Sequence, residues 1–229
     1  MLRQQIPIHQ FIANLPLFKG YAKADLERIA SGTKLVHAQR RTIIFRRGEA
    51  CCGMHAVLFG QLKLTLHAIQ GGQCVIDLVG PGQTLGEAAL FLDKPYIATA
   101  ESLTDTQLVH ISKATVLAEA DRHPKFARRL LVNLSERLHL HIKDLESYAL
   151  YSATGRVVGF LLNDLPECSG DVKPSLTLPA AKGVIASRLN LTHEHFSRIL
   201  HELTTAGLIE MDGRSIKIQD VGGLRALMA

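Results

Sequence analysis

Four polar side chains near the C-terminus share one face of a predicted helix, namely Glu194, Ser197, Arg198 and His201, at positions i, i+3, i+4 and i+7. Residues at this spacing project from the same side of an α-helix. In the major groove of DNA, an arginine can fork onto guanine, a carboxylate can accept from cytosine, and a hydroxyl can reach a base or a phosphate. We therefore expect Glu194, Ser197 and Arg198, with His193 at the helix start, to read bases, although charged helix faces are more often simply solvated.

The neighbouring segments have the pattern of a winged helix-turn-helix. A short helix is predicted at Lys182–Leu189, followed by a turn at Asn190-Leu191 and a second helix that Thr192 caps and Gly207 ends. The apolar side of the second helix faces the core through Phe196, Ile199, Leu200 and Leu203. Two strands, Leu208–Met211 and Ser215–Ile218, follow it as a hairpin. Contacts to the DNA backbone are expected from Thr192, Lys182, Arg188, Arg214, Lys217 and His201.

A long helix is predicted to precede this unit, from Pro124 to about Tyr151. Its apolar positions alternate spacings of four and three, as in a two-stranded coiled coil. The seam consists of Ala127, Leu131, Leu134, Leu138, His141, Leu145 and Tyr148. We expect it to form a homodimer, whereas the simpler alternative is a helix packed on its own domain. A second amphipathic helix is predicted at 152–165 and a loop at Pro166–Pro174.

The N-terminal half has the periodicity of an antiparallel β-barrel or jelly roll. Its short strands are separated by turn residues such as Gly71-Gly72 and Gly80-Pro81-Gly82. Two helical segments are expected before them, at Ile8–Phe18 and Lys23–Ser31. The predicted strands are Arg41–Phe45, His55–Phe59, Gln61–His67, Cys74–Val79, Tyr96–Leu103 and Gln107–Ile111.

These patterns predict an α+β chain of 229 residues with three parts. A barrel sensor domain is expected at 1–122, a dimerisation helix at 123–151 and a winged helix-turn-helix at 152–229. The formal charge of +5 does not locate the DNA site, because residues 151–229 contain 8 basic and 8 acidic side chains. Four cysteines without C-x-x-C spacing, together with the lack of an apolar span, favour a cytoplasmic protein that does not enter a membrane.

The sequence resembles the CRP/FNR family of bacterial regulators over nearly its whole length. The string Glu194-His195-Phe196-Ser197-Arg198 matches the recognition helix of the FNR type, which implies an inverted repeat similar to TTGAT, four further bases and ATCAA. His193 departs from that pattern. The resemblance implies double-stranded DNA and RNA polymerase as partners and a regulator that is not an enzyme. The sequence also resembles the dissimilatory nitrate respiration regulator subgroup, in Phe91-Leu92-Asp93 with the following Pro95 and Ala98-Thr99-Ala100, in Leu134–His139 and in Phe196–Ile199.

The effector pocket implied by the resemblance contains Gly86, Glu87, Tyr96 and Ile97. Tyr96 and Ile97 stand where cyclic-nucleotide members have an Arg-Ser pair for the phosphate, so cyclic AMP is not expected. Glu87 is then expected to be a structural acceptor rather than a ribose ligand. A regulator that binds a cyclic nucleotide through a rearranged pocket is the alternative.

The subgroup is associated with nitric oxide sensing through haem, which makes haem a candidate cofactor. A histidine ligand would come from His9, His55, His67, His139 or His141. An iron–sulfur cluster is not expected, because no cysteine precedes Cys51 and the Cys51-Cys52 pair lacks the spacing. Redox sensing by this pair is a minor alternative. A cupin-like metalloenzyme is disfavoured, since the barrel histidines His37, His55, His67 and His110 are scattered singly.

Overall fold

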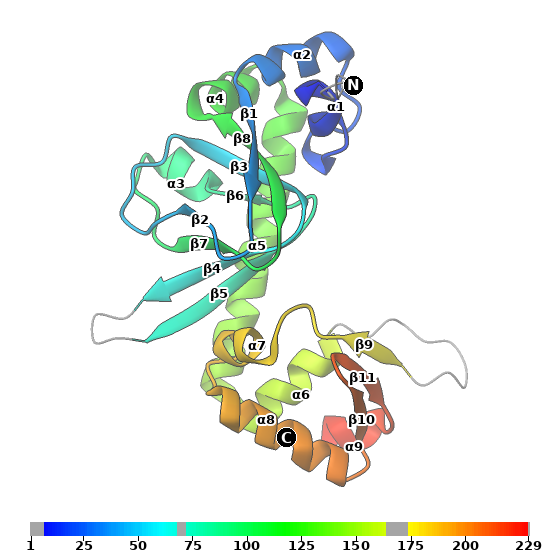
Figure 1. The fold of residues 1–229 in the computed structure, drawn as a ribbon. Coiled ribbons are helices and arrows are strands. Elements are labelled where there is room, and N and C mark those ends of the chain that lie inside the picture. Colours follow the sequence, from blue (N-terminus) through cyan, green and yellow to red (C-terminus); the bar gives the residue numbers. More distant parts are fainter. Residues whose placement is uncertain (1–6, 68–71, 164–173, 229) are drawn as a thin grey trace. The chain divides into compact units, whose positions relative to one another are not determined.

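The computed structural model describes residues 7–67, 72–163 and 174–228. The chain divides into two compact units, Met1–Arg137 and Leu138–Ala229. Within the described ranges, no helix combines the length and hydropathy needed to cross a bilayer. The predicted α+β class is confirmed, with β-sheets in the N-terminal unit and a helix-turn-helix with a small sheet in the C-terminal unit (Figure 1).

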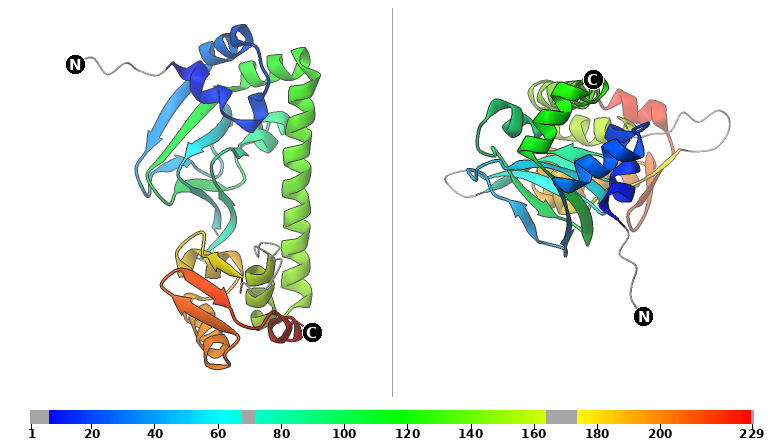
Figure 2. Two further views of the ribbon diagram at one scale, coloured as in Figure 1. Left: turned by 90° about the vertical axis from the view of Figure 1, so that its right-hand side faces the viewer. Right: turned by 90° about the horizontal axis from the view of Figure 1, so that it is seen from above.

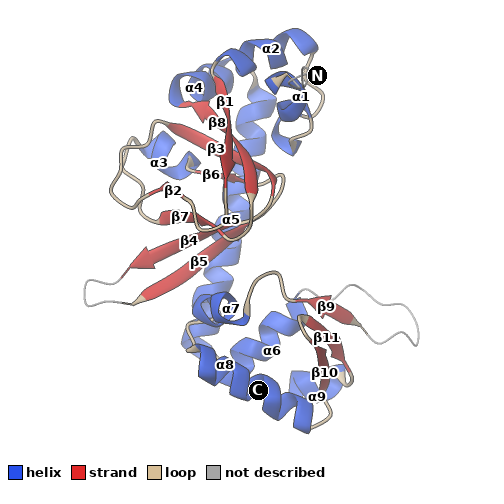
Figure 3. Ribbon diagram, in the orientation of Figure 1, coloured by secondary structure: helices blue, strands red, loops and turns tan. Residues whose placement is uncertain are grey.

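Two four-stranded antiparallel sheets make up the N-terminal unit, with strand orders β1-β8-β3-β6 and β2-β7-β4-β5 (Figure 3). Apolar side chains from both sheets meet in one cluster that includes Phe45, Val57, Leu62 and Tyr96. The strands are β1 (Thr33–Ala38), β2 (Ile43–Phe45), β3 (Gly53–Phe59), β4 (Leu62–His67), β5 (Gln73–Val79), β6 (Thr84–Leu85), β7 (Thr99–Ser102) and β8 (Thr106–Ser112).

Helices cover one end of this unit. Phe18 and Phe126 stack there with ring centroids 5.6 Å apart, in a core that also holds Ile29 and Met54 of strand β3. Figure 2 shows α1, α2 and α4 gathered beside the start of α5. The helices are α1 (Ile8–Ala13), the 3-10 helix η1 (Pro16–Phe18), α2 (Lys23–Ser31), α3 (Glu87–Leu92), α4 (Lys113–Arg122) and α5 (Pro124–Leu150).

Helix α5 runs for 27 residues, close to the predicted bounds. Phe126 and Leu130 are buried in the helical core of the N-terminal unit. The side chains of Leu131, Leu138 and Leu145 are instead 62–65% exposed. The units divide inside α5, so its first half belongs with the sheets, whereas the prediction gave the whole helix to a separate segment.

The C-terminal unit packs four helices with the antiparallel sheet β10-β11-β9. Its elements are α6 (Ala153–Asn163), β9 (Ser175–Thr177), α7 (Lys182–Arg188), α8 (His193–Thr205), β10 (Ile209–Asp212), β11 (Ser215–Ile218) and α9 (Val221–Ala226). These bounds lie within a few residues of the helix-turn-helix and hairpin that the sequence predicts. The predicted loop at Pro166–Pro174 lies outside the described residues except for Pro174.

Three expectations for the N-terminal unit were wrong in detail. The predicted helix Ile8–Phe18 is interrupted after Ala13, because Pro16 cannot continue a helix and starts a 3-10 turn instead. The predicted strand Tyr96–Leu103 begins only at Thr99, since the backbone of Tyr96 bonds to Gly48 and Glu49 in a loop. The predicted strand Arg41–Phe45 likewise begins only at Ile43.

Candidate nucleic-acid interface and effector pocket

Helix α8 is held at its start by the cap that the sequence predicts. The Thr192 hydroxyl accepts a hydrogen bond of 3.2 Å from the backbone N–H of His195. Asn190, in the turn before it, has a φ of 54°, a left-handed conformation that asparagine tolerates better than most residues. The helix ends at Thr205, Ala206 is its C-cap, and Gly207 follows with a φ of 72°.

The two faces of α8 separate cleanly. Phe196, Ile199, Leu200 and Leu203 are all at most 3% exposed, as predicted for the core face. On the other face Glu194, Arg198 and His201 are exposed, with Ser197 half-buried between them and His193 exposed at the helix start. The predicted base-reading side chains therefore lie together on one side of one helix.

The charged side chains on this face are available to bind a partner and contribute little to the stability of the domain. The Glu194 backbone N–H and the Thr192 hydroxyl hold the pKa of the Glu194 carboxyl below its usual value, so this carboxylate is ionised at neutral pH. Arg198 Nε lies 4.0 Å from Glu202 Oε1, and both side chains are more than 60% exposed. An exposed pair at this distance contributes little stability, which leaves the guanidinium available to another partner.

The residues predicted to contact the DNA backbone differ in how far the protein already engages them. The Arg188 guanidinium lies 3.8 Å from Asp144 of α5, and its carbonyl accepts from the Tyr148 hydroxyl. The Arg214 guanidinium donates to the Leu178 carbonyl at 3.1 Å and braces the turn of the hairpin. Lys217 is exposed on β11, and Lys182 is half-buried at the start of α7.

Three of the four predicted effector-pocket residues lie close together in the N-terminal unit. Gly86 has a φ of 94° and precedes α3, and an added Cβ there would lie 3.3 Å from the Tyr96 ring. Tyr96 is 5% exposed and stacks on Phe45 with 3.8 Å between ring centroids. Its hydroxyl donates a hydrogen bond to the Gly53 carbonyl. Ile97 does not join them, because its side chain is 72% exposed.

Glu87, which follows Gly86 and is the third of these neighbouring residues, is 1% exposed and forms a network of hydrogen bonds and ion pairs. Its Oε1 accepts from the Thr84 hydroxyl at 2.9 Å and from Arg137 Nη1 at 3.1 Å. Arg137 also donates to the Thr84 carbonyl and lies 3.2 Å from Asp77 Oδ2. No local sequence pattern predicts a role for Arg137, because its partners lie 50 to 60 residues away in the chain.

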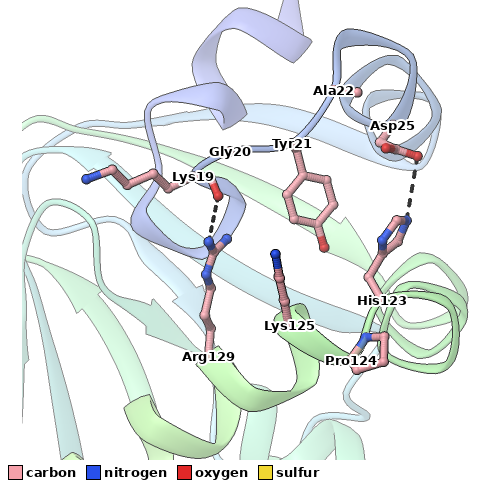
Figure 4. A pocket seen from close by; sticks show the side chains of 9 residues that line it. All are labelled: Lys19, Gly20, Tyr21, Ala22, Asp25, His123, Pro124, Lys125 and Arg129. Carbon is pink, nitrogen blue, oxygen red and sulfur yellow. Dashed lines mark hydrogen bonds and ion pairs between the residues drawn. The ribbon is translucent and has the colours of Figure 1, made fainter.

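A cavity that the sequence did not predict lies among the N-terminal helices (Figure 4). It measures about 660 Å³, and the side chains of Tyr21 and Lys125 point into it. The Arg129 guanidinium at its rim donates to the Lys19 and Leu17 carbonyls at 2.6 and 2.8 Å. Burial, followed by the nearby Glu119 carboxylate, raises the pKa of Tyr21, so its hydroxyl stays protonated.

The candidate haem ligands are spread over the chain. The His55 ring is buried against Phe45 and His110, with centroid distances of 5.7 and 4.8 Å. His67 and His139 are exposed, and His9 is half-buried in α1. His141 is half-buried on α5, 3.9 Å from Asp144. Within the N-terminal unit, His9, His55 and His67 therefore lie on three different elements, α1, β3 and β4.

Two protein-family models match the chain. The cyclic nucleotide-binding domain matches residues 35–123, and the Crp-like helix-turn-helix domain matches residues 155–227. Among curated relatives, the cyclic AMP receptor protein of Thermus thermophilus is 25% identical over 217 residues, with 93% of this chain and 96% of the relative covered.

Solved structures are also similar to this chain over most of its length. The chain is similar to DNR from Pseudomonas aeruginosa, with 30% identity, 98% and 99% of the two chains covered, and a TM-score of 0.50. FixK2 from Bradyrhizobium japonicum has a TM-score of 0.74 at 22% identity, with 86% of this chain and 98% of that chain covered, a likeness that concerns the fold.

Proposed function

Because the chain belongs to the CRP/FNR family of transcription regulators, which are not enzymes, we propose that a homodimer of it reads an inverted-repeat DNA site with α8 of each copy. The observation that carries this proposal is the division of α8 into a buried apolar face and an exposed face with Glu194, Ser197 and Arg198. The Thr192 cap fixes the start of the helix, where a recognition helix contacts base edges.

The homodimer is supported by α5. Leucines that stay more than 60% exposed at the seam positions 131, 138 and 145 leave apolar surface that a second copy would bury. Two copies related by a twofold axis would present two recognition helices, so the half-sites are expected about one turn of DNA apart. The proposed target is an inverted repeat similar to TTGAT, four bases and ATCAA.

The base-reading role is tested by fluorescence anisotropy at one fixed salt concentration, with the inverted repeat and a scrambled duplex of the same composition. The unchanged protein should prefer the inverted repeat. Arg198→Ala should abolish that preference, because a bidentate contact to guanine is worth about 1–3 kcal/mol of discrimination.

Lys182→Ala is the matched control for charge. A lysine that contacts only phosphate should weaken binding to both duplexes alike and reduce the salt dependence by about one counterion. Equal affinity of the unchanged protein for the two duplexes would exclude sequence-specific recognition. Loss of preference in Lys182→Ala but not in Arg198→Ala would contradict the assigned roles.

For the effector, we propose a small ligand other than cyclic AMP in the N-terminal domain. A cyclic phosphate needs an uncommitted cation, and Arg137, which contacts Glu87 of the predicted pocket, already pairs with Glu87 and Asp77. Tyr96 is packed on Phe45 and is not a cation. Calorimetry with cyclic AMP and cyclic GMP tests this, since heat of binding with either one would favour the alternative of a rearranged nucleotide pocket.

Haem with nitric oxide is the other effector that the subgroup resemblance implies. One axial histidine can hold a haem iron, and the candidates differ in exposure, since His55 is buried against Phe45 and His110 whereas His67 and His139 are exposed. Titration of the purified protein with haem, followed by the Soret band with and without nitric oxide, tests this proposal. An interaction with RNA polymerase is likewise proposed from the family and is tested by transcription from a promoter that carries the site.

A further inference from the structure

A cysteine and a histidine meet at the surface of the sheet β1-β8-β3. Cys52 precedes β3 and is exposed, and its Sγ lies 3.5 Å from Nε2 of His110 on β8. The antiparallel register of β3 and β8, in which Gly53 pairs with Ser112, brings the two residues together although 58 positions separate them. The thiol is therefore both accessible and in contact with a potential proton acceptor.

Gly53 keeps this contact open. A Cβ at that position would lie 2.6 Å from His110 Nε2 and 2.2 Å from the Ile111 carbonyl oxygen, so any other residue would displace the ring. The glycine thus has a steric role between the thiol and the imidazole.

The surroundings of His110 favour its neutral form. Burial, and then the positive charge of Lys34 on the neighbouring strand β1, lowers the pKa of this half-buried imidazole. The other titratable group packed against it is His55 of β3, whose pKa burial lowers to about 3 and which is therefore also neutral. Neutral His110 can therefore accept a proton at Nε2, and no carboxylate among the described residues forms an ion pair with it.

We propose that Cys52 is a reactive thiol that exchanges with small soluble disulfides, with His110 as the group that accepts its proton. The S–H proton passes to Nε2, and the resulting thiolate attacks one sulfur of the disulfide. A bond forms between that sulfur and Cys52 as the original S–S bond breaks. The released thiolate takes the proton back from the imidazolium, so Cys52 is oxidised while the disulfide is reduced to one free thiol.

The other described cysteines lack this arrangement. Cys51 is half-buried, and its thiol is directed to the carbonyl oxygens of Gly53 and Gly86 at 3.2 and 3.6 Å. Burial raises the pKa of the Cys74 thiol, which disfavours its thiolate. Among the three cysteines that the structure describes, reaction should therefore be selective for Cys52.

The test uses the full chain and oxidised glutathione as the disulfide. Mass spectrometry of the intact protein gives the rate of adduct formation at neutral pH, and peptide mapping gives its position. Among the three described cysteines, we expect the glutathione adduct on Cys52. The Cys52→Ser variant should form no adduct at Cys51 or Cys74, and Cys51→Ser should react at the unchanged rate. His110→Gln should slow the reaction about tenfold, a modest loss for a removed proton acceptor.

His37→Gln is the matched control, because His37 is exposed on β1 of the same sheet and pairs with Gln107 rather than with a cysteine. Its rate should equal that of the unchanged chain. A pH profile separates proton transfer from a steric effect. If His110 accepts the proton, the rate of His110→Gln should approach the unchanged rate at alkaline pH, where hydroxide in solution removes the proton instead. A deficit that persists at every pH, or modification spread equally over Cys51 and Cys74, would overturn the proposal.

Discussion

At the scale of single residues, His55 is an imidazole that the N-terminal unit keeps neutral. It is 7% exposed, and within the described structure its Nδ1 has no hydrogen-bond partner. Burial, aided by the positive charge on His110, lowers its pKa to about 3. In the unfolded chain the same group titrates near its usual value of about 6.5.

This difference makes stability depend on pH in a defined direction. Between about pH 6.5 and pH 3 the unfolded chain binds a proton that the folded chain does not, so the free energy of unfolding decreases as the pH falls. We expect His55 to account for a loss of about 2 kcal/mol between pH 7 and pH 5. We therefore expect the free energy of unfolding, measured with urea at pH 7 and pH 5, to fall less in His55→Phe than in the unchanged chain. The difference between the two losses should be about 2 kcal/mol.

His37→Phe is the control for this experiment, because it makes the same substitution at an exposed position of the same sheet. His55→Phe can alter stability at both pH values through packing, so only the difference between them reports on protonation. An identical difference in His55→Phe and the unchanged chain would contradict a neutral buried His55.

At the scale of elements, Arg137 joins α5 to the two sheets. Its guanidinium lies 3.1 Å from Glu87 of α3 and 3.2 Å from Asp77 of β5, and it donates to the Thr84 carbonyl of β6. Glu87 is 1% exposed, so removal of the arginine would leave a buried carboxylate without its counter-charge.

We expect Arg137→Met to lower the free energy of unfolding of the N-terminal unit by about 3 kcal/mol, measured by urea titration. The double variant Arg137→Met/Glu87→Gln should lose less free energy of unfolding than the sum of the two single variants. Glu87→Gln removes the carboxylate that Arg137→Met leaves without a counter-charge. Arg128→Met, at an exposed position of the same helix, should change stability by no more than about 0.5 kcal/mol. Strict additivity of the double variant would contradict the coupling.

The elements also separate what sequence patterns predict from what they miss. Helix α8 was predicted almost to the residue because cap, periodicity and stop signals coincide at Thr192 and Gly207. Strands β6 and β9 have only two and three residues, too few for a period of two to stand out. Helix α3 has only six residues, less than two turns, and the β1 burial pattern does not alternate.

The candidate sites divide in the same way. The DNA-reading face lies on one helix, so spacing alone places its residues together. The Glu87–Arg137 pair, the Cys52–His110 pair and the Tyr21 cavity each join segments at least 50 residues apart. Only strand register and helix packing bring such groups together, and neither can be read from local spacing.

At the scale of the whole molecule, the exposed seam of α5 is the proposed surface of assembly. Leu138→Glu would place a carboxylate from each copy at the centre of the proposed interface, where burial of an unpaired charge is strongly unfavourable. We expect this variant to be monomeric in sedimentation equilibrium at micromolar concentration, where the unchanged chain is a dimer.

Leu140→Glu is its matched control. Leu140 is 51% exposed on the same helix but lies off the seam, so the dimer should persist. Dissociation of Leu140→Glu with retention of the Leu138→Glu dimer would place the interface on another face of α5.

The leucines left exposed on α5 also imply that the stability of the folded chain depends on its concentration. If a second copy must cover them, association stabilises the folded chain by mass action, and the melting temperature rises with protein concentration. A cell that makes few copies would then hold the protein in a weaker, more easily degraded monomeric form. The number of molecules per cell would thus set how much regulator persists, before any effector or DNA is bound.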